Sequence, residues 1–573
     1  MTAAAGKTLD GQTELLVTCD GTAVSREFQL LAASITHLAN RISRATLIYQ
    51  DGDAATGEFE LCSSGTLAPG KAIRIAVVAG GQSVPLFEGL TVRQSVRIRT
   101  QGGAQLTIEC RHHSVRLTHG TRVAVDTDVT DDDILGRLLK KQGVSCELRG
   151  LSQRHEQLVQ PGVSDWKFLV ARSRANGCNV LTRVGPIRIE RPERREPAAI
   201  FRFGDGVLLE LDASQDARWQ IKKLQSSRWD SGEQAEVSVG GGGVLPQFAG
   251  ALPAQAIEAV NGTQELVLSN AVATESEARQ RAEAAKLHGV LSQVCGRLRC
   301  SRIVTNVLPG DTIRLQNVSQ PFSGDVYVTG VRHELDSGRA LRTSLQVGTA
   351  EEDRGSESVA AEHLLPPLQG LHPAIVTETV DPAGEYRVRV RLVLSTGIAG
   401  AAPAKTELWA RLATIDAGPG RGLMTRPEPG DEVVVGFNSG AGHCPVIVGM
   451  LHSSAHDPPV APAEGNHIKL LKSRSGLMVQ LNDDKKELSL GTAGGLQLKF
   501  SDQEKKISLT DGSGNTVTLG TDGIQIQSSK ALTMEGKMSA GLKGGQSASV
   551  EGLQVQVSAS GTASIRGSLV SIN

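Results

Sequence analysis

The chain has 573 residues, with 60 Lys and Arg against 61 Asp and Glu, and it combines 64 glycines with only 3% aromatic residues. The balanced charge argues against a dedicated nucleic-acid binder, and the scarcity of aromatic residues argues against an enzyme with an aromatic-lined pocket. The length predicts roughly three to five domains, and the composition fits many short strands joined by tight turns.

The first residues, MTAAAGKTLDGQ, lack the basic start and apolar run of an export signal, so we expect a protein made in the cytoplasm without a signal peptide. No stretch reaches the roughly 18 apolar residues of a membrane span. The eight cysteines are scattered without a Cys-x-x-Cys pair, which favours buried thiols in a reducing compartment over a metal site. The sequence therefore predicts neither a metal nor a cofactor.

Strands are predicted through most of residues 11–118, where "GKAIRIAVVAGGQSVPLFEGLTVRQSVRIR" alternates apolar and polar residues around a Gly-Gly turn. The character changes in residues 119–195, where two helices are expected. One helix has Thr130 as its N-cap and stops at Gly143, and the other begins at Ser164.

Strands return in residues 196–350, interrupted by one helix at 274–291 that starts with the capping-box pair Thr274 and Glu277. The segments expected after them are a polar linker at 351–368, a compact all-β segment at 369–455, a stiff Pro-rich linker at 456–465 and a strand-rich tail at 466–573.

Short alternating runs recur from His467 onward: "HIKLL", "LMVQLN", "ELSLG", "LQLKF", "KISLTD", "TVTLG" and "IQIQ". After Lys530 the pattern tightens to a step of eight residues, as in Gly536, Gly544 and Gly552. A short fixed period indicates one structural unit stacked many times. The apolar residues predicted to form the core of this needle are Ile524, Ile526, Met534, Leu542, Val550, Val557 and Ile565.

Each run offers only one to three apolar residues, too few for one chain to build a core. Several chains wound around a shared axis would bury these residues and leave no open strand edge. We therefore predict an intertwined needle, with three chains as the natural count for a triangular prism. About thirteen rungs at ~4.8 Å would make it ~60 Å long. A single-chain β-solenoid and a disordered tail are the alternatives.

Several blocks of the sequence carry a family resemblance. They are "ANRISRATLIYQDGD", "SDWKFLVARSRANG", "LPGDTIRL", "GDVYVTGVRHEL", "GLMTRPEPGDEVVVGF" followed by "CPVIVGMLHSS", and the closing repeat. Nearly end to end, the chain resembles the spike proteins of contractile injection systems, that is, VgrG of the type VI secretion system and, more closely, the spike of extracellular, tailocin-like particles. The OB-fold block and the closing repeat are the most specific of these matches.

The resemblance implies a mainly β fold, with a hub of two β-barrels and α/β insertions, an OB-fold, and a C-terminal intertwined trimeric β-helix (β-prism) needle. It implies hub barrel 1 at 1–118, the hub α/β region at 119–195, hub barrel 2 at 196–350, the OB-fold collar at 369–455 and the needle at 466–573.

Within the OB-fold, the resemblance implies that Pro427, Pro429 and Gly430 form a tight turn between two strands. The next strand, with Val433 to Val435 and Phe437, is then expected to enter the barrel as a buried strand.

Two departures from relatives of this family carry further expectations. Only about ten residues, 456–465, separate the OB-fold from the needle, so the lysozyme domain of related phage spikes is not expected. The chain runs from the needle into "SLVSIN", so no effector domain is expected either. The resemblance implies that a small PAAR-type tip protein caps this end, with Ser571, Ile572 and Asn573 at the contact.

The clusters of titratable residues favour structural roles. His112 and His113 are expected on a strand, where adjacent side chains face opposite sides and cannot ligate one metal. Asp131 to Asp133 fit a helix start better than a calcium loop, and Asp483 with Asp484 fits a solvated turn better than a glycosidase pair. We therefore predict no enzyme and no catalytic residue.

Binding of oligonucleotides by the OB-fold would need aromatic side chains for stacking. Trp409 and Phe437 are expected to be buried and Tyr386 stands alone, so no nucleic acid is expected as a partner.

The resemblance thus predicts a structural, homotrimeric spike at the head of the inner tube of a contractile particle. The hub would adapt a hexameric tube to a threefold needle, and the needle would puncture the target envelope when the sheath contracts. The expected partners are inner-tube initiator or tube proteins, baseplate proteins and the tip protein, with transient contact to the target membrane; a toxin cargo and release of the particle from its producer are left open. A type VI secretion VgrG and a polysaccharide-binding tailspike are the alternatives.

Overall fold

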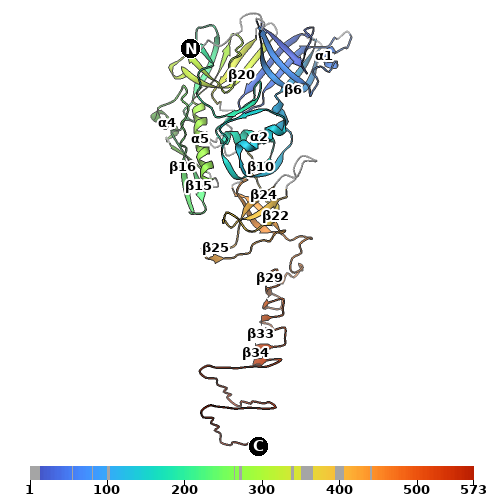
Figure 1. Ribbon diagram of the computed structural model, residues 1–573, viewed down its shortest axis with the longest axis vertical. Helices are drawn as coiled ribbons and strands as arrows, with labels where there is room; N and C mark the ends of the chain where they lie inside the picture. Colours follow the sequence, from blue (N-terminus) through green and yellow to red (C-terminus); the bar gives the residue numbers. More distant parts are fainter. Residues whose placement is uncertain are drawn as a thin grey trace. The chain divides into compact units, whose positions relative to one another are not determined.

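The computed structural model of the chain (Figure 1) describes residues 13–53, 56–79, 82–99, 103–263, 265–269, 274–336, 341–349, 365–393, 406–438 and 442–572. The chain divides into two compact units, Met1–Leu451 and His452–Asn573. None of the helices in the described residues combines the length and the hydropathy needed to cross a bilayer.

One sheet of thirteen strands dominates the N-terminal unit. Its first set of strands is β1 (Glu14–Cys19), β2 (Thr22–Ala23), β3 (Leu30–Leu38), β4 (Arg44–Gln50), β5 (Ala72–Ala79), β6 (Gln82–Arg99) and β7 (Gly103–Arg111), with the short helix α1 (Glu60–Ser63) between β4 and β5. Its second set is β13 (Ala199–Arg202), β14 (Leu208–Gln215), β18 (Val294–Cys300), β19 (Thr312–Gln316), β20 (Gly324–Asp336) and β21 (Arg342–Val347), with the 3-10 turn η2 (Gln320–Phe322).

The two sets repeat one arrangement of strands. The spatial orders are β3-β4-β7-β6 in the first set and β14-β18-β21-β20 in the second. When the four strands of each set are numbered along the sequence, both orders are first, second, fourth and third. The pairing of β20 with β3 joins the two sets. Each set packs its own core, because alternate strand residues point to one side of the sheet. Leu47 and Ile108 lie in the first core, and Leu298 and Leu345 in the second. The two sets of strands thus share one continuous sheet.

The α/β region lies between the two sets in the chain. Its elements are the 3-10 helix η1 (His113–Thr118), β8 (Arg122–Thr130), α2 (Asp131–Lys141), β9 (Cys146–Leu148), β10 (Arg154–Val163), α3 (Asp165–Ala175), β11 (Asn179–Leu181) and β12 (Ile187–Glu190).

Both helices of this region begin at the predicted caps. The Thr130 hydroxyl accepts a hydrogen bond from the Asp133 N–H, and the Asp133 carboxylate accepts one from the Thr130 N–H. The Ser164 hydroxyl likewise accepts from the Lys167 N–H. The placement of His113 on a strand, by contrast, is wrong: His113 starts η1, and the ring of the preceding His112 caps it.

A smaller layer interrupts the second set between β14 and β18. It consists of β15 (Lys223–Asp230), β16 (Ala235–Gly240), β17 (Glu265–Ser269), α4 (Ala254–Asn261) and α5 (Glu275–Leu291). The helix α5 has the predicted capping box of Thr274 and Glu277, and its buried face is rich in alanine. Small side chains allow the helix to approach its neighbours closely.

The strands β22 (His372–Glu378), β23 (Val388–Leu392), β24 (Glu407–Leu412), β28 (Pro445–Met450) and β27 (Glu432–Phe437) close into a five-stranded barrel, with a small hairpin of β25 (Ala417–Gly418) and β26 (Arg421–Gly422). Buried Val390, Val433 and Val435 belong to its core, and Val125 and Val159 from β8 and β10 complete that core. The antiparallel pair of β8 and β10 therefore packs against the core of the barrel.

Gln157 on β10 makes a polar contact between this strand pair and the barrel. Its side-chain oxygen accepts from the Trp409 N–H at 3.0 Å, and its side-chain nitrogen donates to the carbonyls of Trp409, at 3.3 Å, and His443, at 2.8 Å. The amide side chain thus satisfies backbone groups on β24 that no neighbouring strand pairs.

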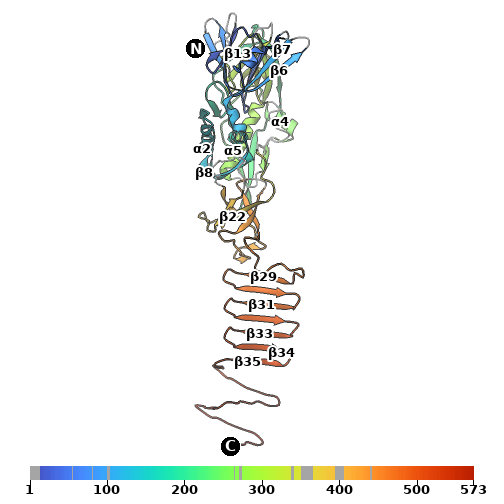
Figure 2. The ribbon, with the colours of Figure 1, turned by 90° about the vertical axis from the view of Figure 1, so that its right-hand side faces the viewer.

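The C-terminal unit begins with seven strands in one antiparallel ladder, each paired with the next along the chain and stacked as rungs in Figure 2. The strands are β29 (Ile468–Lys472), β30 (Met478–Asn482), β31 (Glu487–Gly491), β32 (Gln497–Ser501), β33 (Lys506–Thr510), β34 (Thr516–Gly520) and β35 (Gly523–Gln527). They coincide with the seven alternating runs of the sequence.

A buried network of charges ties together α2, β10, α3 and α5. His155 lies between two carboxylates, with Nε2 3.1 Å from Asp131 and Nδ1 3.1 Å from Glu277. Arg172 forms a two-point ion pair with Asp131 at 2.8 and 2.9 Å, and Asn176 donates to the same carboxylate at 2.8 Å. Four charges of balanced sign therefore share one buried site.

The network decides the protonation of its members. Burial alone would lower the pKa of His155, but its hydrogen bonds to Asp131 and Glu277 raise that pKa above its ordinary value. Burial alone would raise the pKa of Asp131, yet Arg172 and His155 hold it well below the usual range. The two carboxylates therefore favour the charged form of His155.

This network predicts a fall in stability as pH rises. The pKa of His155 is higher in the folded protein than in the unfolded chain, where it is near 6.5. The contribution of His155 to the free energy of unfolding is therefore complete below pH 6.5 and is lost as the pH rises through the folded pKa. His155→Gln should lower the free energy of unfolding by roughly 3–5 kcal/mol at pH 6 and flatten its dependence on pH. Thermal unfolding between pH 6 and 9 measures both effects.

His333→Gln is the matched control. Burial lowers the pKa of His333 to about 3, so its ring is neutral throughout this range. The control should therefore lose stability without a change in slope. An unchanged pH profile in His155→Gln would refute the charged role of His155.

A second prediction concerns the junction between β10 and the barrel. Gln157→Ala should leave the Trp409 N–H unpaired and accelerate its hydrogen exchange, at a cost of about 1–3 kcal/mol. Glu156→Gln is the control. The neighbouring Glu156 forms an ion pair with Arg387, and because its side chain is 62% exposed, this pair contributes little to stability. Equal exchange in both variants would contradict the assignment.

Candidate functional site

The seven-stranded ladder has one apolar face and one polar face. Residues directly opposite each other in an antiparallel ladder point to the same side of the sheet, so the register assigns every side chain to a face. All but one of the fourteen residues of the first face are apolar: Lys469, Leu471, Val479, Leu481, Leu488, Leu490, Leu498, Phe500, Ile507, Leu509, Val517, Leu519, Ile524 and Ile526.

The opposite face carries mostly Gln, Ser, Thr, Lys and Gly. On it, Lys499 lies 2.7 Å from Glu487, an ion pair suited to a face that meets water. Eleven of the thirteen apolar residues on the first face are exposed in a single chain, among them Leu509 at 52% and Ile524 at 72%. An apolar surface this continuous marks an interaction site, because soluble proteins rarely leave one uncovered.

The described residues 528–572 contain no strand or helix. The predicted core residues Met534, Leu542 and Val550 lie here, eight residues apart, and each is exposed by more than two thirds. Val557 and Ile565 are exposed as well. None of the predicted needle core beyond β35 is thus buried by its own chain.

The ladder partners of residues 468–527 lie in the same chain. We predicted several chains wound around a shared axis, but we did not predict that each strand of this ladder pairs with the next strand of its own chain. Strand runs of fixed period do not reveal which strands pair. The site prediction also named only Ile524 and Ile526 from this ladder. The alternation of apolar residues in each earlier run was the signal that could have placed Leu490 and Leu509 on the same face.

The remaining predicted residues are not members of the ladder. Ser571 and Ile572 are exposed, and Asn573 falls outside the described residues. Pro429 and Gly430 form a turn just before β27, where Gly430 has a φ of +97° that favours glycine, and Pro427 is buried. The nearby Asp431 side chain accepts from the Glu428 N–H at 2.8 Å, which braces the turn.

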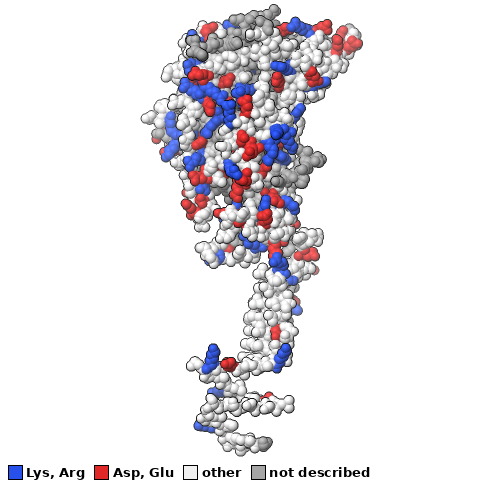
Figure 3. All heavy atoms as spheres, in the orientation of Figure 1, with Lys and Arg blue, Asp and Glu red and all other residues white. Residues whose placement is uncertain are grey.

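The expectation that Trp409 and Phe437 are buried is only partly right, because both are half-buried. The guanidinium groups of Arg387 and Arg389 each lie 5.9 Å from the Trp409 ring, so arginines already occupy its surroundings. On the face drawn in Figure 3, charges of both signs are dispersed over the N-terminal unit and are sparse along the ladder.

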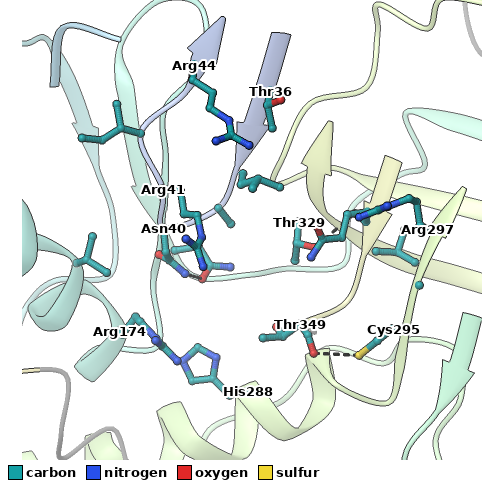
Figure 4. A pocket seen from close by; sticks show the side chains of 18 of the residues that line it. Thr36, Asn40, Arg41, Arg44, Arg174, His288, Cys295, Arg297, Thr329 and Thr349 are labelled. Carbon is teal, nitrogen blue, oxygen red and sulfur yellow. Dashed lines mark hydrogen bonds between the residues drawn. The ribbon is translucent and has the colours of Figure 1, made fainter. Parts of the chain in front are cut away.

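A cavity of about 1370 Å³ lies against the polar side of the thirteen-stranded sheet. Its lining includes Arg41, Arg44, Arg174 and Arg297, and His288 comes from α5 (Figure 4). The polar side chains of β14 also line it. Because β14 is the last strand of the sheet, this cavity borders an open edge.

The titratable groups form no cluster of metal-ligand type in the described part of the chain. Asp131 belongs to the buried network, and Asp483 and Asp484 lie exposed in the turn between β30 and β31. All eight cysteines are free thiols, and burial raises the pKa of Cys110, Cys178, Cys300 and Cys444 to about 12.

Two protein-family models match the chain. The model described as the Alg8 N-terminal domain matches residues 10–337, more than half of the chain. The model described as the type VI secretion system/phage-baseplate injector OB domain matches residues 372–452, the range of the five-stranded barrel. No curated protein matches the sequence.

Solved structures share the fold at low sequence identity. A chain of the half-lidded Francisella PdpA–VgrG complex is 8% identical with a TM-score of 0.53, over 91% of this chain and 88% of that one. For the lidless PdpA–VgrG complex the values are 8%, 0.52, 90% and 98%. The c3393 protein of the E. coli type VI secretion system, described as similar to bacteriophage T4 tail proteins gp27 and gp5, is 14% identical with a TM-score of 0.48, over 76% and 99%.

The match over residues 10–337 covers every strand of the thirteen-stranded sheet except β21, together with the insertions, and the second match covers the barrel that follows. The chain therefore belongs to the Alg8 N-terminal domain family, and its fold is that of a VgrG-like baseplate spike protein.

Proposed function

We propose that the chain is the structural central spike of a contractile injection particle and works as a homotrimer. The observation that carries this proposal is the apolar face of β29–β35, which is exposed in one chain. Three such sheets, set as the sides of a triangular prism, would bury their apolar faces on a common axis and leave their polar faces in water. The family and fold likeness to baseplate spike proteins supports the same role.

Three copies also suit the repeated sheet of the hub. Each chain carries two equivalent sets of strands, so three chains supply six. Six equivalent sets can stack on a hexameric inner tube, while the needle keeps threefold symmetry. The hub is thus the proposed adaptor between tube and spike, and the five-stranded barrel is the proposed collar.

The proposed work of the needle is mechanical. Each inner strand of the ladder is hydrogen-bonded to both neighbours, so bending would have to break several rungs together. With the apolar faces buried on the axis, an axial load from sheath contraction passes along a continuous hydrogen-bonded stack into the target envelope. No catalytic step is assigned to this role.

The finer parts of the proposal follow from the resemblance in sequence. A PAAR-type tip protein would cover Ser571, Ile572 and Asn573, and tube and baseplate proteins would contact the hub. The protein would be made in the cytoplasm and incorporated in the particle. A type VI secretion VgrG is the second candidate, because the description of the matching OB domain names the type VI secretion system as well as the phage baseplate.

The proposal predicts the oligomeric state of the full-length chain. The native mass should be three times that of one chain, and Leu509→Lys should reduce it, because a lysine on the apolar face puts unpaired charges at the axis at a cost of several kcal/mol. Ser508→Lys is the matched control, since Ser508 lies on the polar face of the same strand.

Light scattering coupled to size exclusion measures these masses. A monomeric wild-type chain, or a Leu509→Lys variant as trimeric as Ser508→Lys, would refute the buried axis.

A further inference from the structure

The cavity beside the thirteen-stranded sheet carries an excess of positive charge. Two acidic residues, Glu210 and Asp212, line it. Six arginines line it as well: Arg41, Arg44, Arg111, Arg174, Arg297 and Arg299. Of the two acids, Glu210 is already paired with Arg299 at 3.1 Å. The walls of the cavity therefore attract anions, because clustered charges of one sign raise the local concentration of the opposite sign.

Three of these arginines form no ion pair with a described residue: Arg44, Arg111 and Arg297. Arg297 has Asp212 opposite it in the β14–β18 ladder, whereas Arg44 has Thr36 and Arg111 as its ladder neighbours. Like charges directly opposite each other destabilise the pairing of strands. Arg44 and Arg297 extend into the same space from different strands (Figure 4). An anion bound between these side chains would offset the repulsion.

The size and the lining of the cavity favour a polypeptide over a small anion. Its volume of about 1370 Å³ exceeds the ~300–1,000 Å³ of pockets that enclose a small molecule. Trp166 and Val170 of α3, together with Ile42, add apolar surface to the charged walls. A segment of chain that carries several carboxylates and some apolar side chains matches this lining, whereas an inorganic anion would use only its charged part.

The chain itself supplies a segment of this kind. Residues 350–364, "AEEDRGSESVAAEHL", contain five acidic residues and one arginine. Glu351, Glu352 and Asp353 are consecutive, and the apolar residues 359–361 follow. Residues 350–364 lie outside the described part of the chain, so we infer their place from the residues on either side.

The residues on either side of this segment have contacts at the cavity or next to it. Thr349, the residue before it, lines the cavity. Its N–H donates to the Leu291 carbonyl at 3.0 Å, and its carbonyl accepts from the Cys295 thiol at 3.0 Å (Figure 4). Leu365, the residue after it, packs against the same apolar core as Trp166. The fifteen residues between them span up to ~50 Å when extended, enough to follow the cavity wall.

We propose that the arginine-lined cavity binds the acidic segment at residues 351–357 of the same chain. The three consecutive acids supply the carboxylates, and Arg44, Arg111 and Arg297 supply the guanidinium groups. Because the segment is tethered at both ends, its effective concentration at the cavity is high, and modest individual contacts suffice to hold it.

The segment is also the covalent connection from β21 to β22, the first strand of the barrel. Its binding therefore fastens that connection to the thirteen-stranded sheet. The contact goes beyond the proposed spike function, because it is made within one chain and does not depend on how many chains assemble.

Limited proteolysis of the full-length chain measures how often the segment leaves the cavity. A glutamyl endopeptidase cuts after Glu351, Glu352 and Glu357 only when the segment is released. Arg44→Gln with Arg297→Gln should raise the rate of cutting about tenfold, because charge-assisted contacts are lost. Higher salt should have the same effect on the wild type, since it screens exposed charges.

Two matched variants separate charge from structure. Arg44→Lys with Arg297→Lys keeps both positive charges and should keep the segment protected. Arg202→Gln removes an exposed arginine of β13 that lies outside the cavity lining and donates to the Gln316 side chain at 2.8 Å. Cutting of this control should stay at the wild-type rate.

Coupling with a carbodiimide identifies both the contact and the chain that makes it. The reagent joins a carboxylate to a lysine that touches it, so in Arg44→Lys with Arg297→Lys it should link position 44 or 297 to residues 351–353. Peptide mass spectrometry should find this link in the single-chain band of a denaturing gel. Arg202→Lys is the control and should give no link to residues 351–357.

The other outcomes overturn the proposal. A wild-type segment that is cut as fast as in Arg44→Gln with Arg297→Gln, at low salt, is not bound. A link found only in bands of higher mass would assign the cavity to the segment of a neighbouring copy or to another protein. A monomeric native mass, by contrast, would refute the proposed spike and leave this contact standing.

Discussion

The apolar face of β29–β35 is the constraint on which the account depends. The ladder satisfies its backbone within one chain, yet eleven apolar side chains on one side of it are exposed. Hydrophobic burial contributes about 25 cal/mol per Å², so such a face strongly favours association with another apolar surface. The ladder of a second copy of the chain has an apolar face of the same length and pattern. When two such faces associate, the polar face of each ladder stays exposed to solvent.

The thirteen-stranded sheet also has a surface that its own chain does not cover, in this case unpaired strand edges. Its two repeats pair with each other once, through β20 and β3; in the described residues β14 pairs only with β18, and β6 beyond Leu90 pairs only with β7. Association would satisfy backbone groups at these edges and apolar side chains at the ladder. Both surfaces therefore point to copies of one chain as partners, whereas the buried network around His155 and the contact through Gln157 stabilise the single chain.

Local features of the fold could be predicted well from the sequence. The helix caps at Thr130, Ser164 and Thr274 and the seven runs of the ladder depend on short-range hydrogen bonds and on a period of two, which the sequence carries directly. Long-range features could not be predicted in the same way. Pairing of β20 with β3 joins residues about 300 positions apart, and no local pattern encodes that register. His113 was misplaced because one strand was extended past its end, and the exposure of Trp409 depends on arginines from a neighbouring strand.

The most direct test of the account is a cryo-electron microscopy reconstruction of the purified full-length chain. The account predicts three copies around an axis, with Leu490, Leu509 and Ile526 of each copy facing that axis and the polar face of the ladder in solvent. A single copy whose ladder stands alone, or an assembly whose polar faces meet at the centre, would contradict it.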